Sequence, residues 1–144
     1  MGEVGKIRAK KGEEVVKGLM GQGYTKLIVW KNVCELRHLI YNITKKFPKN
    51  EHRRVSQMCD SARSIKQNIQ EGYKSASIGE YMHHLSIAQG SLGENSGDVD
   101  DCLQDNLINT QEYSGIDNLI KRTDYFFMRL IQSLEVKRKK KEGC

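Results

Sequence analysis

The sequence predicts an all-α protein, an up-down-up-down bundle of four helices. Apolar residues recur at steps of three and four along four separate stretches, a spacing that gathers side chains on one face of a helix. The connections between these stretches are short, which favours antiparallel neighbours. No stretch alternates apolar and polar residues as a strand does. With 144 residues, of which 38% are hydrophobic and 29% charged, the chain fits one domain with one core.

The chain divides into three parts. Residues 1–23 combine glycines with charged residues without a convincing period, so we expect a mobile extension with a short helical piece at 13–20. Residues 24–134 contain the four apolar stripes and form the bundle domain. Residues 135–144 form a basic tail.

The first helix is expected over residues 27–47. Its apolar face consists of Val29, Trp30, Val33, Leu36, Ile40, Ile43 and Phe47. Pro48, the only proline, lacks the amide hydrogen that a continuing helix needs and disfavours helical geometry at the preceding residue. The chain is therefore expected to turn at residues 47–50.

The second helix is expected from about residue 51 to 72. Its apolar stripe is Val55, Met58, Ala62, Ile65 and Ile69. Gly72 is expected to end it, because glycine readily takes the left-handed conformation that follows many helices.

The third helix is expected to begin at Ser77. Ser77 and Glu80 have the spacing of a capping box, in which a hydroxyl and a carboxylate accept hydrogen bonds from free amides at a helix start. The apolar face that follows is Tyr81, Leu85, Ala88, Leu92, Val99 and Leu103. We expect the helix to end within residues 104–109.

The fourth helix completes the bundle. Its apolar face is Tyr113, Ile116, Ile120, Thr123, Phe127, Leu130, Ile131 and Leu134. The apolar pattern stops there, so we expect the helix to dissolve into the basic tail.

The chain has a net charge of +6, and its charged residues are distributed unevenly along the sequence. Residues 26–74 contain 11 basic and 4 acidic residues, whereas residues 75–120 contain 8 acidic residues and neither lysine nor arginine. The candidates for contacting nucleic acid are the basic residues at the first turn and in the tail: Lys45, Lys46, Lys49, Arg53, Arg54, Lys137, Arg138, Lys139, Lys140 and Lys141. Such clusters attract phosphate backbones or an acidic protein surface. A solvated tail without a binding role is the alternative.

Few aromatic residues are available for stacking on bases. Tyr24, Tyr41 and Tyr73 are the only plausible ones outside the apolar faces. Contact with the RNA or DNA backbone is therefore favoured over readout of bases.

Two Glu-x-x-His pairs resemble the ligand motif of di-iron helical bundles. Glu35 and His38 lie in the first helix, and Glu80 and His83 in the third. Helical spacing places these side chains away from the apolar faces, toward solvent or a neighbouring subunit. A di-metal enzyme is therefore the least favoured function, and we expect no metal and no cofactor.

The cysteines do not indicate a catalytic or zinc site. Cys34 with His38 would supply only two zinc ligands. Cys59 and Cys102 flank apolar stripes and are expected to be small packing residues. We see no base-activated nucleophile and no glycine-rich phosphate loop, so no enzyme activity is expected.

The composition indicates a cytoplasmic protein. No apolar run approaches the ~20 residues that a membrane span needs. The four cysteines are far apart and contain no Cys-x-x-Cys pair, so reduced thiols are expected.

The sequence resembles a family of bacterial four-helix-bundle proteins first found as reading frames in intervening sequences of 23S ribosomal RNA genes. Matching residues are Leu27, Ile28, Val29, Trp30, Phe47, Pro48, Glu51, Ser56, Gln57, Ser64, Ile65, Asn68, Ile69, Glu71 and Gly72, then Ser77, Glu80, Tyr81, Leu85, Ile87, Ala88, Gly90, Ser91, Leu92 and Glu94. The resemblance covers residues 24–134. It departs from the family at Lys66, where a proline is usual, and before Tyr24.

The resemblance implies a compact bundle that assembles as a homo-oligomeric ring, often a pentamer, without established catalysis. The bundle is also similar in shape to the accessory variability protein of diversity-generating retroelements, which binds nucleic acid and a reverse transcriptase. That second similarity is architectural, and a shared fold does not establish a shared function.

Small residues on the third helix are candidates for the subunit interface of such a ring. Ser86, Gly90, Gly93 and Gly97 align opposite the apolar face. A glycine inside a helix costs roughly 1 kcal/mol relative to alanine, which close approach of another helix would offset. The alternative is a helix broken near Gly97.

Together these observations predict a non-enzymatic, oligomeric bundle that acts as an accessory or scaffold protein on RNA or DNA. The alternative is a protein-interaction ring whose basic tail binds an acidic partner.

Overall fold

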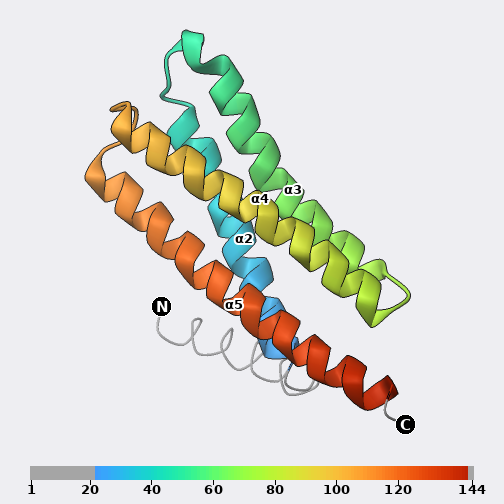
Figure 1. Cartoon of the computed structure of the whole chain (residues 1–144). Helices are drawn as coiled ribbons and strands as arrows, with labels where there is room; N and C mark the ends of the chain where they lie inside the picture. Colours follow the sequence, from blue (N-terminus) through green and yellow to red (C-terminus); the bar gives the residue numbers. More distant parts are fainter. Residues whose placement is uncertain (1–21, 143–144) are drawn as a thin grey trace, which may run out of the picture.

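Four α-helices make up the fold of residues 22–142, which are the residues that a computed structural model describes (Figure 1). They are α2 (Gln22–Thr44), α3 (His52–Lys74), α4 (Ile78–Gln104) and α5 (Thr110–Glu142), with a short 3-10 helix, η1 (Lys49–Glu51), before α3. No strand occurs in this range. The prediction of an all-α fold with four helices is confirmed, while the helical piece expected at 13–20 lies outside the described residues.

The helices pack around one core. α2 contacts α3 and α5, and α4 contacts the same two helices (Figure 1). Two contacts show that α3 and α4 run in opposite directions. Arg54, near the start of α3, pairs with Asp105, just after the end of α4. Gly72, near the end of α3, packs against Tyr81, near the start of α4. None of the described helices is both long and apolar enough to cross a membrane.

Most residues of the four predicted stripes are buried. Buried members include Val29, Val33, Leu36, Ile40, Met58, Ile65, Ile69, Leu85, Leu92, Val99, Ile116, Phe127, Leu130 and Leu134. Trp30, Phe47, Leu103, Tyr113 and Ile131 pack against the core while remaining partly exposed. The stripes therefore identify the face that each helix turns inward.

Polar residues also enter the core, and each of the following donates a hydrogen bond to a backbone carbonyl, although Asn95 Oδ1 has no partner in the described chain. The Thr44 hydroxyl donates to the Ile40 carbonyl at 2.8 Å, and the Thr123 hydroxyl donates to the Leu119 carbonyl at 2.6 Å. Asn95 is fully buried and donates its side-chain amide to the Met58 carbonyl at 3.3 Å. These bonds reduce the cost of removing polar groups from water.

The first connection begins earlier than expected. α2 ends at Thr44, and the amides of Lys46 and Phe47 bond to carbonyls only three residues back. Such tight bonds are typical of a helix end that narrows before a break. The turn expected at residues 47–50 therefore starts at Lys45, while Phe47 still packs against the core.

Gly72 does not end α3 in the left-handed conformation that we expected. The helix continues to Lys74, and no described glycine has a positive φ. Gly72 is buried instead against α4, where an added Cβ would lie 2.7 Å from Tyr81 Cδ1. The residue is required by close packing between helices.

α4 begins as predicted and is not broken. Ser77 Oγ accepts a hydrogen bond from the Glu80 amide at 3.1 Å, and Glu80 Oε2 accepts one from the Ala76 amide at 3.3 Å. The helix then runs without interruption to Gln104. The alternative of a break near Gly97 is wrong, because Asn95 is held in the core by its bond to α3.

The link between α4 and α5 contains one local feature that ends α4 and another that begins α5. Asn106 has φ 59°, and the Leu107 amide bonds to the Cys102 carbonyl at 2.9 Å, a Schellman-type helix end. Asn109 then caps α5, since its Oδ1 accepts from the Glu112 amide at 2.7 Å. α4 thus ends within the predicted interval.

The end of α5 corrects our expectation for the tail. The helix does not dissolve after Leu134 but continues to Glu142. The lysines of the tail are therefore held at helical spacing. Positive side chains in the last turn also interact favourably with the negative end of the helix dipole.

Candidate nucleic-acid interface

The basic residues predicted to contact nucleic acid do not form one site. Lys45, Lys46, Lys49, Arg53 and Arg54 lie around the connection from α2 to α3. The second group lies at the end of α5, at the opposite end of the bundle (Figure 1). We call these the tip cluster (Lys45, Lys46, Lys49, Arg53 and Arg54) and the α5 cluster (Lys137, Arg138, Lys139, Lys140 and Lys141).

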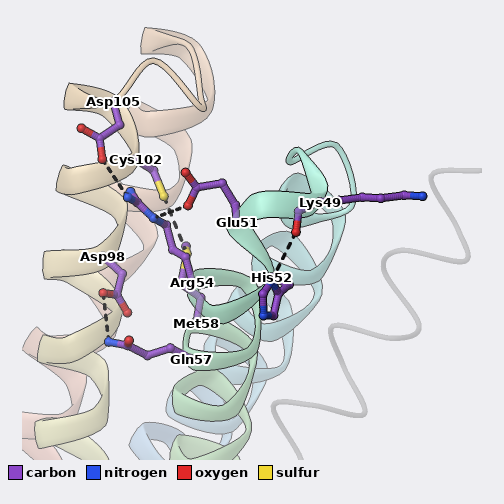
Figure 2. Close-up of polar contacts among 9 residues, drawn as sticks. All are labelled: Lys49, Glu51, His52, Arg54, Gln57, Met58, Asp98, Cys102 and Asp105. Carbon is purple, nitrogen blue, oxygen red and sulfur yellow. Dashed lines mark hydrogen bonds and ion pairs between the residues drawn. The ribbon is translucent and has the colours of Figure 1, made fainter.

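Arg54 is the most constrained residue of the tip cluster. Figure 2 shows its guanidinium between Glu51 and Asp105. Its Nε lies 3.0 Å from Glu51 Oε2, and its Nη2 donates to Asp105 Oδ2 at 2.8 Å. The hydrogen bond to Asp105 is the main cause of a raised Arg54 pKa. Arg54 therefore ties α3 to the end of α4. Its charge is already compensated by two carboxylates, so it is less available to a phosphate than its prediction as a nucleic-acid contact requires.

Acidic residues of α4 lie close to the ion pair between Arg54 and Asp105. Gln57 donates to Asp98 Oδ1 at 3.4 Å, and the buried Cys102 thiol points to Met58 Sδ at 3.7 Å (Figure 2). Burial raises the pKa of Asp98, and the nearby charges of Asp101 and Glu94 raise it further. The negative potential of these residues opposes binding of a phosphate backbone beside Arg54.

Lys46 of the tip cluster also forms an ion pair. Lys46 Nζ lies 3.0 Å from Glu112 Oε2, which joins the end of α2 to the first turn of α5. Lys45 lies over the Tyr41 ring, with Nζ 4.4 Å from the ring centroid. Within the described chain, Lys45, Lys49 and Arg53 are exposed and have no carboxylate within ion-pair distance. Three of the five predicted tip residues therefore have a charge free for an anion.

The α5 cluster has a higher density of uncompensated charge. Arg138 Nη2 pairs with Glu135 on the same helix, at 2.9 Å. In the described part of the chain, no carboxylate pairs with the exposed residues Lys137, Lys139, Lys140 and Lys141. Four lysines within five positions of a regular helix thus offer positive charge to solvent.

Lys26, which was not among the predicted contacts, extends the α5 cluster. It lies in the second turn of α2 and lines the same hollow as Lys137 and Lys141. Partial burial is the main cause of a lowered Lys26 pKa. The nearby positive charge of Lys137 lowers it further. The predicted up-down-up-down topology was the available signal, because in such a bundle the start of the first helix lies beside the end of the fourth.

The small residues proposed for a subunit interface are exposed on α4. Ser86, Gly90, Gly93 and Gly97 are all exposed, and a Cβ added to any of the three glycines would meet nothing within 4 Å. Between Gly93 and α5 lies a hollow of about 280 Å³, whose lining includes Leu92, Ile120 and Asp124. This face of the described chain leaves room for a neighbouring helix.

The remaining candidates fall where the helical spacing places them. Glu35, His38, Glu80 and His83 are exposed, and within residues 22–142 no three metal-ligating side chains are grouped to hold an ion. Cys102 is buried as a packing residue. Cys59 and Cys34 are half-buried, with Cys59 Sγ 3.7 Å from the Thr44 hydroxyl.

Comparisons with known proteins agree with the fold. A crystal structure of a protein of unknown function from the S23 ribosomal protein family of Bacteroides thetaiotaomicron superposes with a TM-score of 0.70 and 20% identity. The match covers 75% of this chain and 98% of that one. No curated protein sequence matches this chain. The sequence model of the 23S rRNA-intervening sequence protein family matches residues 25–126. The chain therefore belongs to the 23S rRNA-intervening sequence protein family.

Proposed function

We propose that this protein is a non-enzymatic accessory or scaffold protein that contacts the backbone of RNA or DNA through basic residues. The observation that carries the proposal is the α5 cluster, in which four lysines have no carboxylate partner in the described chain. The chain belongs to a family named after the intervening sequences of 23S rRNA, and this supports a function that involves RNA. The tip residues Lys45, Lys49 and Arg53 would be a second, weaker contact because acidic residues of α4 lie nearby.

Assembly would strengthen such weak contacts. We propose an up-down-up-down bundle that forms a homo-oligomeric ring, with five subunits as the resemblance implies. The exposed glycines of α4 support this proposal, because each costs roughly 1 kcal/mol in a helix and the open space above them would admit a neighbouring subunit. A ring presents several α5 clusters together, which raises avidity without any new contact.

Each lysine in contact with phosphate releases counterions, so binding weakens as salt rises. The test measures affinity for duplex DNA and for structured RNA across a salt series. Two doubly substituted variants are compared, Lys139→Gln with Lys140→Gln in the α5 cluster, and Lys45→Gln with Lys49→Gln in the tip cluster. On duplex DNA, removing one lysine–phosphate interaction should reduce the slope of log affinity against log salt by about 0.9.

We expect the α5 substitutions to flatten the slope and the tip substitutions to change it less. A slope reduced only by the tip substitutions would move the interface to the other end of the bundle. Absence of binding at low salt would reject the nucleic-acid function and favour a ring that binds an acidic protein. In that case, binding of an acidic polypeptide should depend on the same lysines.

A further inference from the structure

A shallow hollow of about 210 Å³, open to solvent, lies between the last turns of α5 and the connection from α3 to α4. We call it the lysine pocket, and the residues that define it are Lys26, Tyr73, Ser77, Tyr81, Lys137 and Lys141. The buried residues Tyr81 and Leu134 contribute to its lining, whereas Tyr73, Lys137 and Lys141 are exposed. Since a water molecule takes about 30 Å³ of liquid volume, the hollow has room for a small anionic group and ordered water.

Three lysines of two helices converge on the lysine pocket. Lys26 comes from α2, and Lys137 and Lys141 lie one turn apart on α5. In the described chain none of the three has a carboxylate within ion-pair distance. Like charges brought together without a counterion repel one another, and a bound anion would remove that cost.

Aromatic rings fix the position of Lys26. Its Nζ lies 5.3 Å from the centroid of the Tyr73 ring and 5.3 Å from that of Tyr81. The two ring centroids are 5.7 Å apart. Cation–π contacts of this kind hold an ammonium group while leaving its N–H donors available.

The start of α4 adds neutral donors to the lysine pocket. Ser77 Oγ accepts from the Glu80 amide, and the amide of Ile78, the first residue of α4, has no hydrogen-bond partner in the described chain. Ser77 and Ile78 both line the pocket. Free amides at the positive end of a helix dipole favour phosphate groups.

Tyr81 contributes its ring, and not its hydroxyl, to the lysine pocket. The side chain is 7% exposed, and its hydroxyl oxygen is buried away from the hollow. The ring holds the Lys26 ammonium together with Tyr73. Recognition of an anion in the lysine pocket therefore falls to the three lysines and the start of α4.

We propose that the lysine pocket binds a phosphate monoester, the group found at the end of a nucleic-acid strand or on a free nucleotide. A monoester carries nearly two negative charges at neutral pH, against one for a backbone diester, and so suits three lysines. It is also attached to its molecule on one side only, so its free oxygens can face lysines of both helices at once. For a strand end, the inference rests on the proposed function, because the adjoining backbone would contact Lys139 and Lys140.

The experiment compares two single-stranded oligonucleotides of one sequence, with and without a 5′-phosphate, as ligands of the full chain. We expect the 5′-phosphate to raise affinity by about tenfold, the effect of roughly 1.4 kcal/mol. Lys26→Gln and, separately, Lys137→Gln should abolish this preference. Lys66→Gln is the matched control, because Lys66 also lies over an aromatic ring, 5.4 Å from the Trp30 centroid, and has no ion pair in the described chain.

Direct titration with inorganic phosphate and with a mononucleoside 5′-phosphate forms the second arm. If these bind with dependence on Lys26 while the two oligonucleotides bind equally, the pocket takes a free phosphate compound and not a strand end. If phosphate binds but neither oligonucleotide does, the proposed nucleic-acid function fails and the pocket stands. The proposal is overturned if the 5′-phosphate gives no preference and neither small phosphate binds, or if Lys26→Gln and Lys66→Gln behave alike. Thermal unfolding of each variant verifies that it is folded.

Discussion

Gly72 and Tyr81 join α3 to α4 through a contact that leaves no room for a side chain at residue 72. A Cβ on Gly72 would lie 2.7 Å from Tyr81 Cδ1 and 3.1 Å from Cε1. Tyr81 is buried, and its ring lies near Tyr73 and Lys26. The contact therefore sets the spacing between the two helices at the end that contains the lysine pocket.

Gly72→Ala should destabilise the protein although alanine favours helix. Overpacking costs about 1–3 kcal/mol, against a gain of up to ~1 kcal/mol from replacing glycine in a helix. We expect the free energy of unfolding to fall by about 1 kcal/mol or more, as measured by urea denaturation. Gly115→Ala is the control, since nothing lies within 4 Å of a Cβ there, and it should leave stability unchanged or raise it. Equal effects of the two changes would show that the Tyr81 contact is not tight.

Gly90→Leu tests the subunit interface. If a neighbouring helix packs on the small residues of α4, a bulky side chain should reduce the mass of the native assembly measured by native mass spectrometry. Gly115→Leu places the same side chain at an exposed helical glycine of α5 and should leave the mass unchanged. An assembly unaffected by Gly90→Leu would place the interface elsewhere.

Arg54→Lys should cost about 1 kcal/mol of stability, because one ammonium cannot reproduce the two-sided contact of a guanidinium with Glu51 and Asp105. Arg53→Lys is the neighbouring control at an exposed site, where a change within about 0.5 kcal/mol is expected. Chemical denaturation of the two variants checks the difference. If both lose the same stability, the link between α3 and the end of α4 has no energetic role.

Glu112 should make stability depend on acid pH. The Asn109 amide, and then Lys46, lower its pKa from the ordinary value of 4.5. A carboxylate with a lowered folded-state pKa stabilises the fold above its unfolded pKa, and that contribution is lost as pH falls through the folded-state pKa. In unfolding experiments from about pH 6 to about pH 3, the wild type should lose its stability advantage over Glu112→Gln. A constant difference between the two proteins would contradict this role.

The periodicity of apolar residues predicted the helices because each one turns a single face to one core. It did not reveal the role of Gly72, because the space for a side chain at that position is taken by the Tyr81 ring of another helix. It also missed the buried Asn95, whose partner is the Met58 carbonyl of α3. Contacts between helices decide such positions, and they are not visible in the spacing along one helix.

The candidate site was only partly predictable for the same reason. The run from Lys137 to Lys141 is evident in the sequence, but the pairing of Arg54 with Asp105 spans 51 positions. Lys26 lies far along the chain from Lys137 and meets it only because α2 and α5 pack side by side. Conversely, the capping boxes at Ser77 and Asn109 are local, and both follow from spacings of three residues.

If the unaltered chain binds the nucleic-acid backbone through its lysines, its affinity should fall as the salt concentration rises. Fluorescence anisotropy of a labelled duplex DNA, measured over a range of salt concentrations, gives the slope of log affinity against log salt. Three or more lysine contacts predict a slope of about −2.7 or steeper. A slope near zero, or no binding at the lowest salt concentration, would contradict the account.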